Sequence, residues 1–151
     1  MSIPFRLLIP RSLYDRMVTH AQAELPLECC GLLAGEPPPD QTLVPGIPNL
    51  MATHYYPLRN AAASPVEFLS DAKEMFSAVR DMRHLGTEIL AVFHSHPTSE
   101  PVPSRTDLER NFSGDVMNLI VGLAGGQPMM RGWWLSSDGY QEADWELLDE
   151  G

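Results

Sequence analysis

Two histidines one residue apart, His94 and His96, stand at the end of an apolar segment, and Asp107 follows after a proline-rich loop. In a β-strand, residues i and i+2 point to the same face, with Cα atoms about 6.6 Å apart. The two imidazole rings can therefore converge on one ion, and the loop is long enough to bring Asp107 back to them. Two imidazoles and one carboxylate form a ligand set that suits Zn²⁺.

A set of three protein ligands favours a catalytic role for such an ion. Structural zinc sites usually have four protein ligands, whereas catalytic sites keep one position for water. Water bound to a metal can have its pKa lowered to about 7, and it then needs a nearby base to accept its proton.

The same residues also fit a purely structural role. Ser104 and Asp107 form an S-x-x-D pattern related to the capping box, which starts many helices. A histidine near a strand end is also more often a hydrogen-bonded polar residue than a metal ligand. The residues alone leave both interpretations open. The two are compatible, because an N-cap would fix the helix that presents Asp107.

The hydrophobic pattern around these residues predicts a sheet packed with helices. Apolar residues at helical spacing indicate two longer helices, which Pro26 and Gly86 end, and Ser70 is expected to cap the second. Strands and helices are intermixed, which predicts an α/β (mixed α+β) fold with a mixed, mainly antiparallel β-sheet. Strands are expected over residues 5–10, 28–36, 42–47, 51–58, 88–96, 116–124, 128–136 and 140–148, and helices over 11–25, 70–85 and 104–112.

The composition restricts the class of protein. A chain of 151 residues with 44% hydrophobic residues is long enough for one domain, expected over residues 1–151. The net charge of -10 opposes binding to nucleic acid or anionic lipid. No apolar run approaches a membrane span and the N-terminus lacks the features of a signal peptide, so a cytoplasmic location is expected.

Other residues that could bind metals are interpreted as structural. The adjacent Cys29 and Cys30 lack the C-x-x-C spacing of zinc sites, so packing is expected for both. His20 and His84 are expected on exposed helix surfaces, and His54 is expected to pack in a strand.

The segment "HSHPTSEPVPSRTD" resembles the motif of the JAMM (MPN+) zinc metalloproteases, in which His-Ser-His-Pro is followed by six residues and Ser-x-x-Asp. The resemblance implies one catalytic Zn²⁺ with His94, His96 and Asp107 as its ligands. It also implies that Ser104 helps to position the water and to stabilise the oxyanion. The fold implied is the JAMM/MPN (cytidine-deaminase-like) architecture.

Two upstream segments extend the resemblance. "PLECCGLLAGE" is similar to the family pattern P-x-E-x-x-G-h-L-h-G, which places the catalytic glutamate at Glu28. Glu24 is the nearby rival, but it belongs to the preceding helix, before Pro26. "RNAAASP" resembles the N-x-A-x-S-P segment of bacterial members and begins with Asn60.

The resemblance implies a compact, prokaryotic type of peptidase or isopeptidase. It would hydrolyse the bond after the C-terminal glycine of a ubiquitin-like or sulfur-carrier protein, through zinc-activated water with Glu28 as general base. The alternatives are a non-catalytic MPN scaffold that only binds partners and an Fe(II) enzyme with a facial triad. A zinc deaminase is excluded because its P-C-x-x-C pattern is missing.

Overall fold

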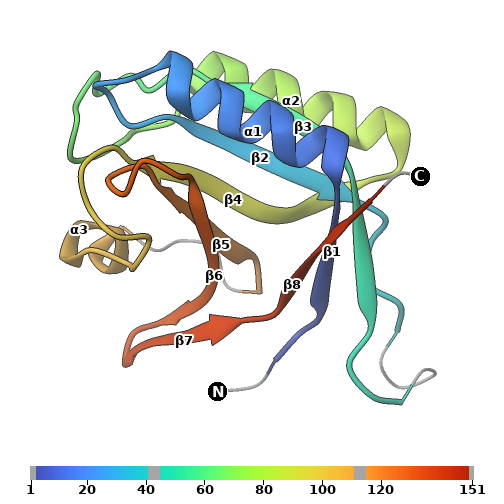
Figure 1. The fold of residues 1–151 in the computed structure, drawn as a ribbon. Helices are drawn as coiled ribbons and strands as arrows, with labels where there is room; N and C mark the ends of the chain where they lie inside the picture. The colour runs from blue at the N-terminus through green and yellow to red at the C-terminus, as the bar shows by residue number, and fades with distance from the viewer. Residues whose placement is uncertain (1–2, 41–44, 111–114, 150–151) are drawn as a thin grey trace.

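The computed structural model describes residues 3–40, 45–110 and 115–149. Within them the chain forms eight strands in one sheet, in the order β7-β6-β5-β4-β2-β3-β1-β8, and three helices (Figure 1). The strands are β1 (Arg6–Pro10), β2 (Cys30–Gly35), β3 (Asn49–Leu58), β4 (Glu88–His96), β5 (Met117–Gly122), β6 (Met129–Ser136), β7 (Gly139–Ala143) and β8 (Trp145–Leu148); the helices are α1 (Arg11–Ala23), α2 (Ala72–Leu85) and α3 (Arg105–Glu109).

The sheet is mixed, as the sequence predicts. β4 pairs with β5 in parallel, and β1 runs parallel to both β3 and β8. The other four pairings, β2 with β3, β2 with β4, β5 with β6 and β6 with β7, are antiparallel. β4 therefore lies in the interior of the sheet: it pairs with β2 as far as His94 and with β5 from Ala91 to His96.

The sheet curls so that its two edges are connected by the chain. β7 and β8 occupy opposite edges, yet only Asp144 separates them in sequence. Figure 1 shows them as two successive arrows, β7 beside β6 and β8 beside β1. The carbonyl oxygen of Asp144 accepts a hydrogen bond of 3.2 Å from the backbone N–H of Leu7, so pairing with β1 begins at the bend.

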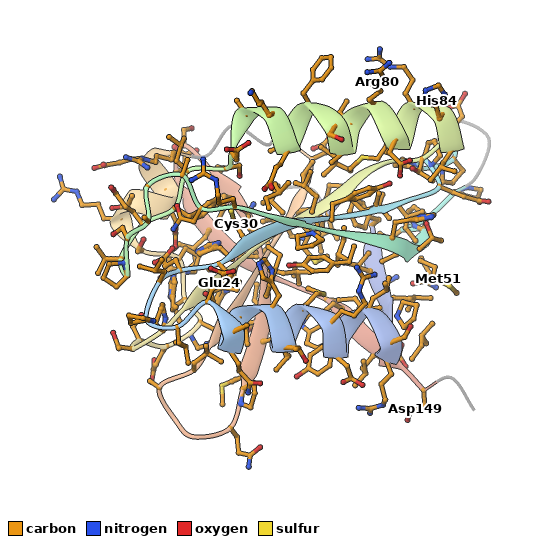
Figure 2. The ribbon with its side chains drawn as sticks, turned by 90° about the horizontal axis from the view of Figure 1, so that it is seen from above. Glu24, Cys30, Met51, Arg80, His84 and Asp149 are labelled. Carbon is orange, nitrogen blue, oxygen red and sulfur yellow. The ribbon has the colours of Figure 1, made fainter. Side chains whose placement is uncertain are left out.

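The two longer helices cover opposite faces of the strands β2, β3 and β4 (Figure 2). The α1 side holds the largest cluster of buried apolar side chains, which includes Met17, Leu33 and Phe93. The α2 side holds a smaller cluster that includes Leu32 and Met82. Successive residues of β2 and β4 point to opposite faces of the sheet, and both faces are covered by apolar side chains.

Both cysteines belong to this packing, as expected. Cys29 joins the cluster under α1, whereas Cys30 joins the cluster under α2. Burial raises the pKa of Cys29 to about 12 and that of Cys30 to about 11, so both remain thiols at neutral pH.

Several element boundaries differ from the sequence-based expectation. Residues 45–47 are not in a strand, and the remainder of the expected strand 42–47 lies outside the described residues. Pro45 and Pro48 have no backbone N–H to donate to a ladder, which disfavours a strand here. The antiparallel partner of β3 is β2. The expected last strand is divided at Asp144 into β7 and β8.

The helix ends also differ. α2 is capped by Asp71 rather than Ser70, since the Asp71 carboxylate accepts from the backbone N–H of Glu74 at 3.0 Å. α1 ends at Ala23, ahead of Leu25, because a residue before proline disfavours helical geometry. α3 ends at Glu109; the end expected near Phe112 lies outside the described residues.

The expected exposure of His20 is wrong. Its side chain is only 15% exposed, and its Nδ1 lies 2.6 Å from the hydroxyl oxygen of Tyr55 on β3. Helical periodicity alone does not show that a strand residue reaches the helix surface.

Among the helices of the described chain, none is long and apolar enough to cross a membrane.

Gly35 at the end of β2 provides a test of this packing. A Cβ added there would clash with the backbone carbonyl oxygen of Met51 on β3, and backbone cannot move aside as a flexible side chain can. We expect Gly35→Ala to lower the free energy of unfolding by about 1–3 kcal/mol, measured by urea denaturation. Gly125→Ala is the control, because a Cβ there meets nothing within 4 Å. Equal stability of Gly35→Ala and the wild type would contradict the close approach of β2 and β3.

Candidate metal centre

The structure brings His94, His96 and Asp107 together. Nε2 of His94 lies 3.1 Å from Asp107 Oδ1, and Nε2 of His96 lies 3.1 Å from Asp107 Oδ2. The two Nε2 atoms are 3.2 Å apart. The histidine side chains are 3% and 5% exposed and that of Asp107 is 9% exposed, so the three donor groups form a buried cluster.

The spacing of these donor atoms fits a single metal ion. Zinc binds nitrogen and carboxylate oxygen at about 2.0–2.2 Å, so two ligands of a tetrahedral site lie about 3.3 Å apart. Donor separations of 3.1–3.2 Å are close to that value. The structure thus brings together the three residues that the sequence selects as ligands, and they could hold one ion.

The strand and its neighbours explain why the two imidazoles face the same side. His94 and His96 project to the face that also carries α3, whereas Ser95 between them projects to the other face. The Ser95 hydroxyl accepts a 2.8 Å hydrogen bond from the backbone N–H of Cys29, and the Ser95 N–H donates to the Cys29 carbonyl at 3.2 Å. These two bonds hold the end of β4 against the chain that leads into β2.

The ring of His96 is oriented by the loop after β4. Its Nδ1 lies 2.8 Å from the carbonyl oxygen of Glu100. A carbonyl oxygen only accepts, so Nδ1 carries the hydrogen and Nε2 presents a lone pair to the cluster when the ring is neutral. A metal-binding histidine is commonly held in this way by a hydrogen bond from its other ring nitrogen.

His94 is held by packing instead. The ring of Phe68 stacks on it at a centroid distance of 4.7 Å, with 28° between the planes. Its Nδ1 is buried and has no hydrogen-bond partner among the described residues. Burial lowers the pKa of His94, which favours the neutral imidazole that binds metals.

Asp107 lies in the first turn of α3 and also joins the cluster. Its backbone N–H donates to the Ser104 hydroxyl oxygen at 3.1 Å, and its Oδ2 accepts from the Ser104 backbone N–H at 2.8 Å. Burial raises the pKa of Asp107, but hydrogen bonds from His94 and His96 outweigh burial and hold that pKa well below its usual range. The capping box and the candidate ligand cluster therefore exist together.

Glu28 lies beside this cluster. It precedes β2, is 4% exposed, and its Oε1 is buried with no hydrogen-bond partner in the part of the chain that the structure describes. Burial raises the pKa of Glu28 to about 8, with His96 opposing the rise and Asp107 adding to it. The rival Glu24 is exposed and faces His20 across 3.8 Å, so it is not part of the cluster.

Residues 10–136 match the family model of the prokaryotic homologs of the JAB domain. The chain belongs to this family. It is 34% identical to a desampylase from Haloferax volcanii over 70% of this chain and 72% of that protein. It is 30% identical to a CysO-cysteine peptidase from Mycobacterium tuberculosis over 76% of this chain and 72% of that protein.

Solved structures agree with the fold of this JAB-domain chain. A solution structure of a protein from Desulfitobacterium hafniense is similar with a TM-score of 0.81 and 33% identity, covering 95% of this chain and 94% of that one. A JAB1/MPN domain protein from Archaeoglobus fulgidus shares the fold with a TM-score of 0.52 and 18% identity, covering 94% of this chain and 96% of that one. The predicted JAMM/MPN family and fold are confirmed. The predicted enzyme class is also confirmed, because the named relatives are hydrolases.

Three contacts of the JAB-domain site were not predicted from the sequence. The sequence contains no pattern that predicts the contacts of the Glu100 carbonyl and the Phe68 ring with the histidines. Every residue has a carbonyl group, and an aromatic residue in a loop can pack in many ways. The third contact is the hydrogen bond of 3.0 Å from Asn60 Nδ2 to the carbonyl oxygen of Glu28. The "RNAAASP" segment marks Asn60, but the motif alone does not show what its side chain contacts.

Zinc is expected to stabilise the folded JAB domain. A ligand that binds only the native state, at 100 times its Kd, adds about 2.7 kcal/mol to the free energy of unfolding. We expect zinc to raise the Tm of the wild type, EDTA to reverse the rise, and Asp107→Asn to reduce it strongly. Asn keeps an oxygen for the capping box, so loss of the cap is a small part of the effect. Glu109→Gln in the same helix is the control, and an equal rise in wild type and Asp107→Asn would contradict the assigned ligand.

The pKa of Glu28 gives a pH dependence of stability for the metal-free protein. Because that pKa is raised from 4.5 to about 8, the folded state holds a proton that the unfolded state loses, and stability falls as pH rises between these values. We expect Glu28→Gln to gain stability relative to wild type from pH 5 to pH 8.5, measured by urea unfolding with EDTA. Glu109→Gln serves as the exposed control. A difference between Glu28→Gln and wild type that does not change with pH would contradict a buried, protonated Glu28.

Proposed function

We propose that this JAB-domain protein is a zinc-dependent metallopeptidase or isopeptidase. Its substrate would be a ubiquitin-like or sulfur-carrier protein, hydrolysed at the peptide or isopeptide bond that follows a C-terminal glycine. The observation that carries the proposal is the cluster of two imidazoles and one carboxylate whose neighbouring donor atoms lie 3.1–3.2 Å apart. Glu28 interacts with His96 and Asp107, and its buried Oε1 has no hydrogen-bond partner among the described residues.

His94, His96 and Asp107 would hold the ion in this proposal. Bound zinc supplies a Lewis acid for the scissile carbonyl and lowers the pKa of water to about 7. His96 is kept in the correct tautomer by Glu100, and Asp107 is kept in place by the capping box, so the ligands are oriented before any ion arrives.

Glu28 would act as the general base. A carboxylate with a free oxygen beside the cluster can take a proton from the attacking water and pass it to the leaving amine. Burial raises the pKa of Glu28 in the metal-free protein, and a bound Zn²⁺ nearby would lower that pKa and favour the ionised carboxylate that accepts a proton. Glu28 lies just before β2, and its carboxylate interacts electrostatically with His96 and Asp107.

Ser104 would stabilise the negative charge that develops on the carbonyl oxygen. Its hydroxyl oxygen accepts the backbone N–H of Asp107 through a lone pair. The hydroxyl hydrogen is not used in that bond, so it can donate to an oxyanion. One serine can thus cap α3 and contribute to catalysis.

The burial of the site supports a glycine at the cleavage point. His94, His96 and Glu28 are 2%, 4% and 4% exposed, so a substrate carbonyl must come very close to groups that the fold nearly covers. Glycine has no Cβ and allows the closest approach of a backbone. The names of the desampylase and the CysO-cysteine peptidase support a small carrier-type protein as the substrate class.

The proposed base is tested by Glu28→Gln. We expect the zinc-loaded variant to retain its metal and to cleave carrier-protein fusions extended past their C-terminal glycine at least about 100-fold more slowly than wild type. Cleavage is read by mass spectrometry and metal content by elemental analysis. Glu24→Gln is the control and should cleave at the wild-type rate.

Three outcomes would overturn parts of this proposal. Full activity of Glu28→Gln would show that the base is misassigned. No cleavage of any fusion by zinc-loaded wild type would favour a non-catalytic scaffold. Iron in unsupplemented protein together with oxygen-dependent turnover would favour a facial-triad enzyme instead.

A further inference from the structure

The side chain of Asn60 is buried between Glu28 and the loop formed by residues 61–69, hereafter the 61–69 loop. Asn60 is 8% exposed. Its Nδ2 donates to the carbonyl oxygens of Glu28 and Glu67, both at 3.0 Å. Its Oδ1 accepts from the backbone N–H groups of Ala62 at 3.0 Å and Leu69 at 2.9 Å. An amide has two N–H donors and two acceptor lone pairs, so all four are used.

The backbone of Glu28 is held by this arrangement rather than by the sheet. β2 begins at Cys30, and its ladders with β3 and β4 start there. The N–H of Glu28 donates to the carbonyl oxygen of Ser64 at 2.9 Å, and its carbonyl accepts from Asn60. Both backbone polar groups of Glu28 are therefore bonded to Asn60 or to the loop that Asn60 fills.

The 61–69 loop is held together by its own backbone hydrogen bonds. Its ends are joined by the bond from the Ala61 N–H to the Leu69 carbonyl at 2.7 Å, next to the bridge between Asn60 and Ser70. Near its far end, Phe68 stacks on His94. The loop thus contacts the candidate base on one side and a candidate ligand on the other.

Arg110 connects the same loop to the end of α3. Its guanidinium donates to the Phe68 carbonyl at 3.3 Å and lies 3.3 Å from the Glu67 carboxylate. Glu28, His94 and the helix that carries Asp107 therefore meet around one loop, and Asn60 is the side chain inside it.

We propose that Asn60 is a positioning residue, which through its Nδ2 hydrogens sets the place of Glu28 relative to His94, His96 and Asp107. This inference rests on the proposed function, in which Glu28 is the base. The Oδ1 atom of Asn60 accepts hydrogen bonds that hold the loop, whereas its Nδ2 donates the hydrogen bond that holds the backbone of Glu28. Misplacement of a reacting group by about 1 Å can lower a rate by about 100-fold, so a small shift of Glu28 has a measurable effect.

Asn60→Asp separates the two halves of the amide. Aspartate has nearly the same shape and keeps the oxygen that accepts from Ala62 and Leu69, but it has no N–H to donate to Glu28 and Glu67. In the zinc-loaded variant we expect kcat to fall by about 10- to 100-fold, with KM within about threefold of wild type and one zinc retained per chain. A purely structural role predicts a lower Tm with unchanged kcat per folded, zinc-loaded molecule.

Amide hydrogen exchange provides a readout that does not depend on activity. We expect the Glu28 N–H of the zinc-loaded protein to exchange at least about 10-fold faster in Asn60→Asp, while the Leu69 N–H keeps its protection. Arg59→Gln is the matched control, because the Arg59 side chain is 65% exposed and pairs with Asp71, next to the end of the loop. This control should leave both kcat and the exchange of Glu28 at wild-type values.

The outcomes separate this inference from the proposed function. Wild-type kcat in Asn60→Asp, with active wild type as reference, overturns the positioning role and leaves the peptidase intact. If wild type cleaves nothing, the proposed function fails, and the exchange of the Glu28 N–H then decides whether Asn60 holds Glu28. Should Asn60→Asp not fold, Asn60→Ser, whose hydroxyl is too short to reach both carbonyls, takes its place in the same measurements.

Discussion

The carboxylate of Asp107 is shared between a helix start and two imidazoles, and the arrangement of the candidate site follows from that sharing. One oxygen accepts from the backbone of Ser104 at 2.8 Å, while the two oxygens lie 3.1 Å from the histidine nitrogens. Because α3 can begin only where this capping box forms, the position of the helix and the position of the third donor are set together. The loop between β4 and α3 must bring the capping box to the histidines, and the same loop brings the Glu100 carbonyl to His96.

The site combines groups whose burial is unfavourable unless a ligand compensates for it. Glu28 Oε1 and His94 Nδ1 are both buried without a hydrogen-bond partner among the described residues. Such groups cost free energy in a protein that only needs to fold. Buried polar groups without hydrogen-bond partners are expected mainly at functional sites, and here two of them lie around one cluster. Apolar packing around the cluster, which includes Cys29, Cys30 and Phe68, contributes favourably to the free energy of folding and offsets this cost.

The sequence predicts local features of this protein well and long-range ones only through motifs. The spacing of His94 and His96 on a strand, and of Ser104 and Asp107 at a helix start, involves neighbours in the chain, so period and capping rules apply directly. The placement of Glu28 depends on its hydrogen bonds with Asn60 and Ser64, far along the chain, which no local pattern encodes; only the family motif predicted it. The same reason explains why the contact of His20 with Tyr55 and the four hydrogen bonds of Asn60 were found only in the structure.

The bend at Asp144 has a consequence for how the chain folds during synthesis. β1 pairs with β3 on one side and with β8 on the other, and β8 lies more than 130 residues further along the chain. A ribosome releases β1 first and β8 last, so one edge of β1 stays without its partner while the rest of the sheet is made. Closure of the curled sheet is therefore a late, non-local event. Until it occurs, the backbone N–H and C=O groups on that edge of β1 are open to pairing with a strand of another chain.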